Sequence, residues 1–218
     1  MAAESISYQI VIPDELRSSD WRAMQAVAYD AYIAGLPRRT SGEIMHFTQM
    51  NHPEEFAAFR INPNRSVAEG RLNPNQSFGR TRIAIATHNA TVVGYGSAAN
   101  NTSGRTAAER WAKMHLTTEH RVVWLAELVV GPQYQRQRIG TRLAGLLLAQ
   151  FKDEQPVSTY TWRENKAGMG LAQALGFVVT DPSIPVRPFG DSAGPAEMVR
   201  WERENRYVQA AVDRILAD

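Results

Sequence analysis

The chain has 218 residues, of which 44% are hydrophobic, and it contains no cysteine. This length suits one domain with a complete core, and the lack of cysteine excludes disulfides, cysteine-bound zinc and a cysteine nucleophile. The 24 basic and 22 acidic residues leave a net charge of +2, which gives no indication of nucleic-acid binding. The sequence has no apolar run long enough to span a membrane and no signal-peptide pattern at residues 1–5, so we expect a cytoplasmic protein without a membrane partner.

The chain is predicted to begin with a strand and a helix. Ser7–Ile12 alternates and contains β-branched residues, which predicts the strand. Ser19 or Asp20 can cap a helix that continues to about Ala34 and ends before Gly35.

Residues 41–50 and a segment beginning at Pro53 are expected to form two further helices. Residues 60–80 are rich in Asn, Pro and Gly, a composition typical of a long surface loop. The alternative is a lid or a partner-contact segment.

The middle of the chain predicts a β-hairpin. Strands are expected over Thr81–Thr87 and Thr91–Ser97, with the turn at His88-Asn89. Gly94–Ala99 matches the Gly-x-Gly-x-x-Gly/Ala pattern of dinucleotide sites, but its glycines fall inside the strand pattern, so we reject that interpretation. An insert at about 100–118, with a short helix of its own, is expected before the next strand.

Strands and helices alternate in the second half of the chain. The predicted elements are, in order, a strand Val122–Val130, a helix Ile139–Phe151, a strand Pro156–Trp162, a helix Asn165–Leu175, strands Phe177–Thr180 and Met198–Trp201, and a helix Glu204–Leu216. Prolines 182, 185 and 188 predict a loop between the last two strands. The whole order indicates an α/β protein of the α+β type, with a mixed, twisted sheet covered by helices on both faces.

The stretch from Glu127 to Leu143 carries the strongest functional signal. A strand with a buried pattern leads through Gly131-Pro132 into a polar loop, and the loop opens a helix with Gly140 in its first turn. The first N–H groups of a helix have no intrahelical partner, and the helix dipole favours negative charge there. The sequence therefore predicts a phosphate site between Gln135 and Thr141.

This spacing resembles motif A of the GCN5-related N-acetyltransferase (GNAT) superfamily, in which Gln/Arg-x-x-Gly-x-Gly/Ala holds the pyrophosphate of acetyl-coenzyme A. Arg138 stands where the family has its first glycine, and Val130-Gly131-Pro132 matches the lead-in. The resemblance implies one GNAT domain over 1–218, a mostly antiparallel sheet of about seven strands and a C-terminal helix at about 203–217. It also implies these cofactor contacts: Leu128, Val129, Val130, Gln135, Arg136, Gln137, Arg138, Ile139, Gly140, Thr141 and Asn165.

Asn165 belongs to a second match, because Trp162–Asn165 followed by Gly176-Phe177 resembles motif B of the family. There the asparagine often contacts the pantetheine arm, and a helix N-cap is the alternative role. The family's tyrosine that protonates the departing thiolate is replaced by Ala172. A thiol has a pKa of roughly 8.5 and needs little help to leave, so water, Tyr160 or Tyr134 could substitute.

The resemblance implies direct transfer of an acetyl group to the primary amine of a small molecule or peptide, with no metal. Glu127 is the candidate base, because family members often carry an acid there and burial raises a carboxyl pKa toward neutral. The alternative is that Glu127 points to solvent or pairs with an arginine. Strand alternation would place it in phase with Val123, Leu125 and Val129.

Two further expectations complete the interpretation. Family members often dimerise, so a homodimer is possible. A non-catalytic acyl-coenzyme A-binding or regulatory module is the rival to an enzyme: Ala172 favours it and Glu127 disfavours it. The five histidines show no His-Glu-x-x-His spacing, which agrees with a metal-free site.

Overall fold

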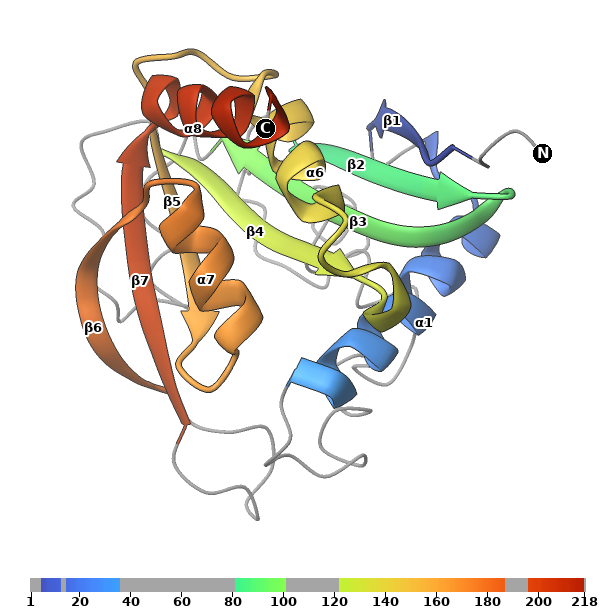
Figure 1. Ribbon diagram of the computed structural model, residues 1–218, viewed down its shortest axis with the longest axis horizontal. Helices are drawn as coiled ribbons and strands as arrows, with labels where there is room; N and C mark the ends of the chain where they lie inside the picture. The colour runs from blue at the N-terminus through green and yellow to red at the C-terminus, as the bar shows by residue number, and fades with distance from the viewer. Residues whose placement is uncertain (1–4, 13–14, 36–80, 101–121, 187–195, 218) are drawn as a thin grey trace, which may run out of the picture.

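The computed structural model describes residues 5–12, 15–35, 81–100, 122–186 and 196–217. Seven strands form one sheet in the order β1-β2-β3-β4-β5-β7-β6 (Figure 1). Their bounds are β1 Ser7–Val11, β2 Thr81–His88, β3 Thr91–Asn100, β4 Val123–Val130, β5 Pro156–Trp162, β6 Val178–Val186 and β7 Ala196–Glu204. Neighbouring strands are antiparallel, except that β4 and β5 are parallel. The predicted fold class is confirmed.

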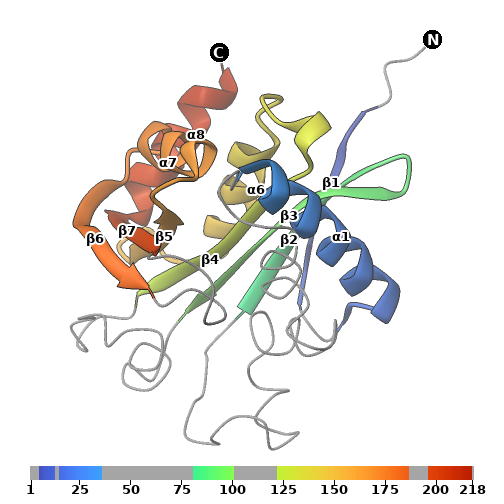
Figure 2. The same ribbon diagram turned by 90° about the horizontal axis from the view of Figure 1, so that it is seen from below.

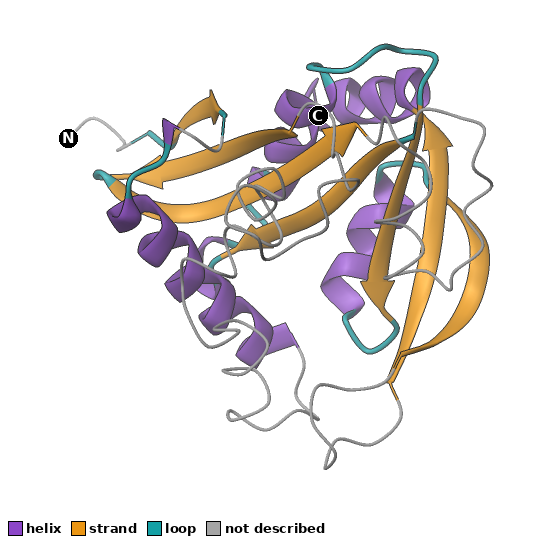
Figure 3. Ribbon diagram, turned by 180° about the vertical axis from the view of Figure 1, so that it is seen from behind, coloured by secondary structure: helices purple, strands orange, loops and turns teal. Residues whose placement is uncertain are grey.

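Helices cover both faces of this sheet, as expected. They are α1 Ser18–Gly35, α6 Ile139–Leu148, α7 Lys166–Ala174 and α8 Asn205–Ala217, with a short 3₁₀ turn, η2, at Pro132–Tyr134. Side chains of α6, α7 and α8 share one hydrophobic cluster with the sheet, whereas α1 packs in a second cluster with Tyr95 and Val129. Seen from behind, α1 lies on the near side (Figure 3).

Two strand glycines allow α6 to lie close to the sheet. A Cβ atom on Gly96 would lie 2.9 Å from Cδ1 of Leu147 in α6, and one on Gly94 would lie 3.4 Å from Cδ1 of Leu143 in α6 and 2.9 Å from the Val129 carbonyl oxygen on β4. The 2.9 Å distances are shorter than van der Waals contact, so a side chain at Gly96 would push against α6 and one at Gly94 would push against β4. The two glycines lie inside β3 and serve packing, which agrees with rejecting the dinucleotide motif.

Two expected boundaries need correction. The hairpin turn is at Asn89-Ala90, one residue later than predicted, and both residues have positive φ, 50° and 59°. Helix α6 ends at Leu148 and not at Phe151. The buried Asn205 amide donates to the carbonyls of Leu148 (2.9 Å) and Lys152 (3.2 Å), so it stabilises the chain where it leaves the helix.

The predicted proline loop is also wrong in part. Pro182 and Pro185 lie within β6, which continues to Val186, and β7 is longer than expected. Among the described strands β6 is at the edge of the sheet, and its register with β7 is irregular between Asp181 and Ile184. Edge strands and irregular positions of this kind tolerate proline. The predictions for 41–50, 53 onward, 60–80, Pro188 and nearly all of the 100–118 insert fall outside the described residues.

Candidate active site

A cleft opens where β4 and β5 separate. The two strands pair at Val123–Val157 and Trp124–Ser158, and the Thr159 hydroxyl donates to the Leu125 carbonyl at 2.9 Å just beyond. Past that point the strands diverge, with α7 on one side of the opening and α1 and α6 on the other (Figure 2). The cleft has a volume of about 890 Å³, which is the size of a typical ligand pocket.

The cleft brings together nearly all of the residues predicted to hold a cofactor. Those that line it are Leu128, Val129, Val130, Gln135, Arg136, Arg138, Ile139, Gly140, Thr141 and Asn165, together with Glu127. Gln137 does not line it; its side-chain amide donates to the Gln133 carbonyl at 3.4 Å. Segments more than 100 residues apart, from the last turn of α1 to the start of β7, meet in this cleft.

The loop before α6 has an unusual backbone. Arg136 and Arg138 adopt φ of 63° and 61°, the left-handed region in which side chains are strained. Alternation of left-handed and ordinary residues aims successive N–H groups into one concavity, which binds anions. Arg138 is also the N-cap of α6 and makes no side-chain capping bond. The first N–H groups of the helix are therefore available to an anionic ligand.

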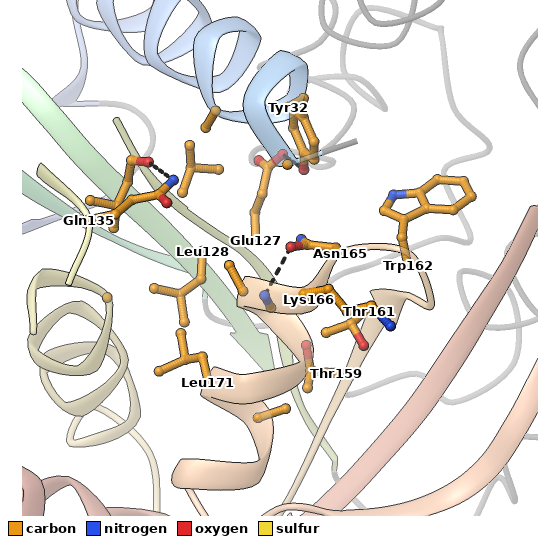
Figure 4. Close-up of a pocket in the computed structure, with 18 of the residues that line it drawn as sticks. Tyr32, Glu127, Leu128, Gln135, Thr159, Thr161, Trp162, Asn165, Lys166 and Leu171 are labelled. Atoms are coloured by element: carbon orange, nitrogen blue, oxygen red, sulfur yellow. Dashed lines mark hydrogen bonds between the residues drawn. The ribbon is translucent and has the colours of Figure 1, made fainter. Parts of the chain in front are cut away.

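Side chains attach this loop to β4 and add positive charge to it. The Gln135 amide donates to the Val130 carbonyl at 3.2 Å (Figure 4). Arg136, Arg138 and Arg142 are exposed, so their guanidinium groups can meet phosphate without first losing a buried partner. A diphosphate fits this loop in both charge and backbone geometry.

A β-bulge decides where Glu127 points. Ser97 pairs with Glu127 and Ala98 pairs with Leu125, so β4 has one more residue than β3 at this place. The extra residue shifts the alternation of the strand. Val123 and Leu125 belong to the cluster under α6, whereas Val129 belongs to the cluster under α1. Glu127 is in phase with Val129, as predicted, but not with Val123 and Leu125.

Glu127 is 5% exposed, so the solvent-facing alternative is wrong. Tyr32 of α1 donates a hydrogen bond to Oε1 of Glu127 at 3.2 Å (Figure 4). Ser97, opposite Glu127 on β3, is 2% exposed. Sequence reasoning missed both neighbours, because Tyr32 is 95 residues away and the bulge that aligns these side chains leaves no pattern in the sequence.

Asn165 holds the other side of the cleft. Its Oδ1 accepts from the Gly168 N–H at 2.9 Å, so its predicted role as the N-cap of α7 is confirmed. Its side chain lines the cleft and is drawn next to Glu127 in Figure 4. The amide nitrogen of Asn165 is close to the helix, because a Cβ atom on Gly168 would lie 2.8 Å from it.

Tyr134 and Tyr160, whose hydroxyl groups could replace the missing tyrosine, lie in different surroundings. Ala172 is buried and lines the cleft, as do Tyr134 and Tyr160. The Tyr134 hydroxyl lies 3.3 Å from Nδ1 of His88. Burial raises the pKa of Tyr160 to about 12, so its hydroxyl is protonated at neutral pH.

Within the described part of the chain, no group of three or more His, Cys, Asp or Glu side chains is placed to hold a metal ion. None of the described helices is both long and apolar enough to cross a membrane.

A sequence model of the acetyltransferase (GNAT) family matches residues 46–177. The match covers more than half of the chain, and the chain therefore belongs to this family. No curated protein matches the sequence significantly.

Solved structures share the fold at low sequence identity. The PaiA N-acetyltransferase of Thermoplasma acidophilum, in complex with coenzyme A, is 16% identical, with a TM-score of 0.55 over 92% of this chain and 99% of that one. YncA of Salmonella typhimurium, with its cofactor acetyl-CoA, is 14% identical, with a TM-score of 0.55 over 92% and 94%. NAA60 of Arabidopsis thaliana, in complex with a bisubstrate analogue, is 11% identical, with a TM-score of 0.56 over 92% and 98%.

Proposed function

We propose that the protein transfers an acetyl group from acetyl-coenzyme A to a primary amine of a small molecule or peptide, by direct attack and without a metal. The observation that carries the proposal is the buried carboxylate of Glu127 in the same cleft as a cationic loop whose backbone conformation suits an anion. Packing alone gives no reason to bury a carboxyl group where two strands diverge, so Glu127 is a candidate for a catalytic role.

Coenzyme A suits the residues that line the cleft. The backbone of Gln135–Thr141 and the guanidinium of Arg138 would hold the diphosphate. The edge of β4 that faces β5 carries the backbone groups of Leu128, Val129 and Val130, which would hold the pantetheine arm as a strand holds an added neighbour. Structural neighbours solved with coenzyme A and acetyl-CoA support the same cofactor. When bound, this cofactor supplies an acetyl group activated as a thioester.

We assign the removal of the amine proton to Glu127. A primary amine has a pKa of about 10.4 and enters the site as ammonium, so it must lose a proton before it can attack. A carboxylate within reach, directly or through one water, can take that proton.

Replacing Glu127 with glutamine tests this role. Glu127→Gln keeps the shape of the side chain and removes the base, so we expect kcat to fall by about 10²–10⁴-fold with little change in the Kd for coenzyme A. Coenzyme A release with a panel of amines and titration calorimetry measure the two quantities.

Glu164→Gln is the matched control, because Glu164 also lines the cleft. It should leave kcat within about twofold, as expected of a carboxylate outside the reaction. An equal loss in both variants would point to the general charge of the cleft and would remove Glu127 as the base.

The second candidate is a non-catalytic acyl-coenzyme A-binding module, which Ala172 at the usual tyrosine position favours. Such a module would bind coenzyme A in calorimetry and would give no turnover with any amine in the panel.

A further inference from the structure

Tyr32 lies on the helix that closes the cleft from the α1 side. The buried side chains of α1 are Trp21, Met24 and Ala28, and Ala31 and Tyr32 continue that stripe against the same cluster. Successive steps of three and four residues keep them on one face. The packing of α1 against the sheet therefore positions Tyr32.

The bulge in β4 is the second half of the arrangement. It turns Glu127 toward the same cluster, where Val129 packs with Met24 and Tyr95. Tyr32 and Glu127 thereby meet at 3.2 Å between the phenol oxygen and Oε1. Figure 4 shows the tyrosine ring beside the carboxylate at the end of the cleft formed by α1.

We infer that Tyr32 is a positioning residue for Glu127: its hydroxyl holds the carboxylate in the orientation and charge state needed to accept the amine proton. This role rests on the proposed function. A hydrogen bond to one carboxylate oxygen fixes the orientation of the whole carboxylate group. The donor also favours the ionised form, against the desolvation that burial imposes.

Other titratable groups near this site are few among the described residues. Tyr95 packs in the α1-side cluster, and the remaining titratable side chains that line the cleft are Tyr134, Arg136, Arg138, Tyr160, Glu164 and Lys166. Tyr32 donates a hydrogen bond to the Glu127 carboxylate, so its removal should change the titration of Glu127.

Tyr32→Phe removes the hydroxyl and keeps the ring with its packing. Loss of a donor to the charged form raises the pKa of Glu127, so the acidic limb of the kcat/KM profile should move to higher pH. At neutral pH we expect kcat/KM to fall by about tenfold, as for other lost hydrogen bonds to charged groups, with the coenzyme A Kd unchanged. Tyr29→Phe, three residues earlier on the same helix, is the matched control and should change neither quantity.

Two measurements separate this role from general damage. Carbon-13 NMR of the Glu127 carboxyl, assigned with Glu127→Gln, reports its pKa without any turnover; we expect a higher pKa in Tyr32→Phe than in the wild type. In a Glu127→Gln background, Tyr32→Phe should have almost no further effect on kcat/KM, because the two residues act as one unit.

The outcomes are distinct. An unchanged Glu127 pKa in Tyr32→Phe, or fully additive kinetic losses, overturns the inference while acetyl transfer by the wild type still supports the proposed function. A wild-type protein that binds coenzyme A and acetylates no amine overturns the proposed function and the role of Tyr32 with it. A raised pKa together with a non-additive loss of kcat/KM supports both.

Discussion

Arg138 combines a strained backbone with a useful charge. Its φ of 61° costs a residue with a side chain roughly 1–2 kcal/mol, and glycine, which the family usually has there, would avoid that cost. The guanidinium offers compensation, because it can meet a phosphate that glycine cannot contact. Strain of this kind is typical of binding loops.

Substitution at Arg138 should separate stability from affinity. We expect Arg138→Gly to raise the free energy of unfolding without ligand by about 1 kcal/mol and to weaken coenzyme A binding about tenfold. Urea denaturation and titration calorimetry measure the two effects. Arg138→Ala is the matched variant: it loses the guanidinium and keeps the left-handed backbone, so affinity should fall without any gain in stability. A stability gain in both variants would contradict the strain argument.

At the scale of single residues, the sequence predicted those features that depend on neighbours close in the chain. Asn165 as an N-cap and the loop before Gly140 depend on residues a few positions apart. Glu127 was predicted as a candidate from its place in an apolar strand and from the family resemblance, but its direction depends on a bulge formed with β3, and its partner Tyr32 comes from α1. Contacts of this range are set by tertiary packing, which periodicity in one segment does not encode.

Between elements, close packing of α6 and α8 depends on Gly145. A Cβ atom there would lie 2.6 Å from Cγ1 of Val212. Two packed helices cannot separate at a single residue. To accommodate a Cβ atom at Gly145, α6 and α8 would have to move apart as a whole, or Val212 would have to change rotamer.

Gly145→Ala should therefore destabilise the protein, although alanine is the better helix former. We expect a loss of about 1–3 kcal/mol in the free energy of unfolding. Gly170→Ala in α7 is the control: a Cβ atom there meets nothing within 4 Å, so the gain of about 0.5–1 kcal/mol from helix propensity should appear. Val212→Ala should restore part of the stability of Gly145→Ala, measured by urea denaturation. Independent, additive effects of the two substitutions would contradict a steric cause.

Element types followed from periodicity more reliably than element ends. β5 has the predicted bounds, Pro156–Trp162, because a proline and a polar turn mark its ends. α6 stops earlier than its apolar repeat indicated, and the side chain of Asn205, which lies 57 residues later in the chain, donates to the Leu148 carbonyl at the end of the helix. β6 continues through two prolines because its position at the edge of the sheet, which no local pattern reveals, makes them tolerable.

At the scale of the whole molecule, β4 and β5 divide the sheet into two parts. β1 to β4 lie on one side and β5, β7 and β6 on the other, joined by two residue pairs at the base of the cleft. A ligand between the parts would contact both. Binding should therefore stabilise the junction more than either outer edge.

Hydrogen–deuterium exchange tests this expectation. With coenzyme A at a hundredfold excess over its Kd, the folded state gains about 2.7 kcal/mol, and exchange should slow most in peptides from residues 125–141 and 159–168. Peptides from β1 serve as the internal control and should change less. Protection confined to one part of the sheet would contradict a ligand that bridges the cleft.

The prolines of β6 affect how separate molecules meet. An unpaired strand margin is a template on which another chain can add its own strand, and this is a common route to insoluble aggregates. Proline on an edge strand opposes such pairing, because it has no N–H to donate. β6 carries two prolines, Pro182 and Pro185, so we expect this edge of the sheet to resist the addition of a strand from another molecule.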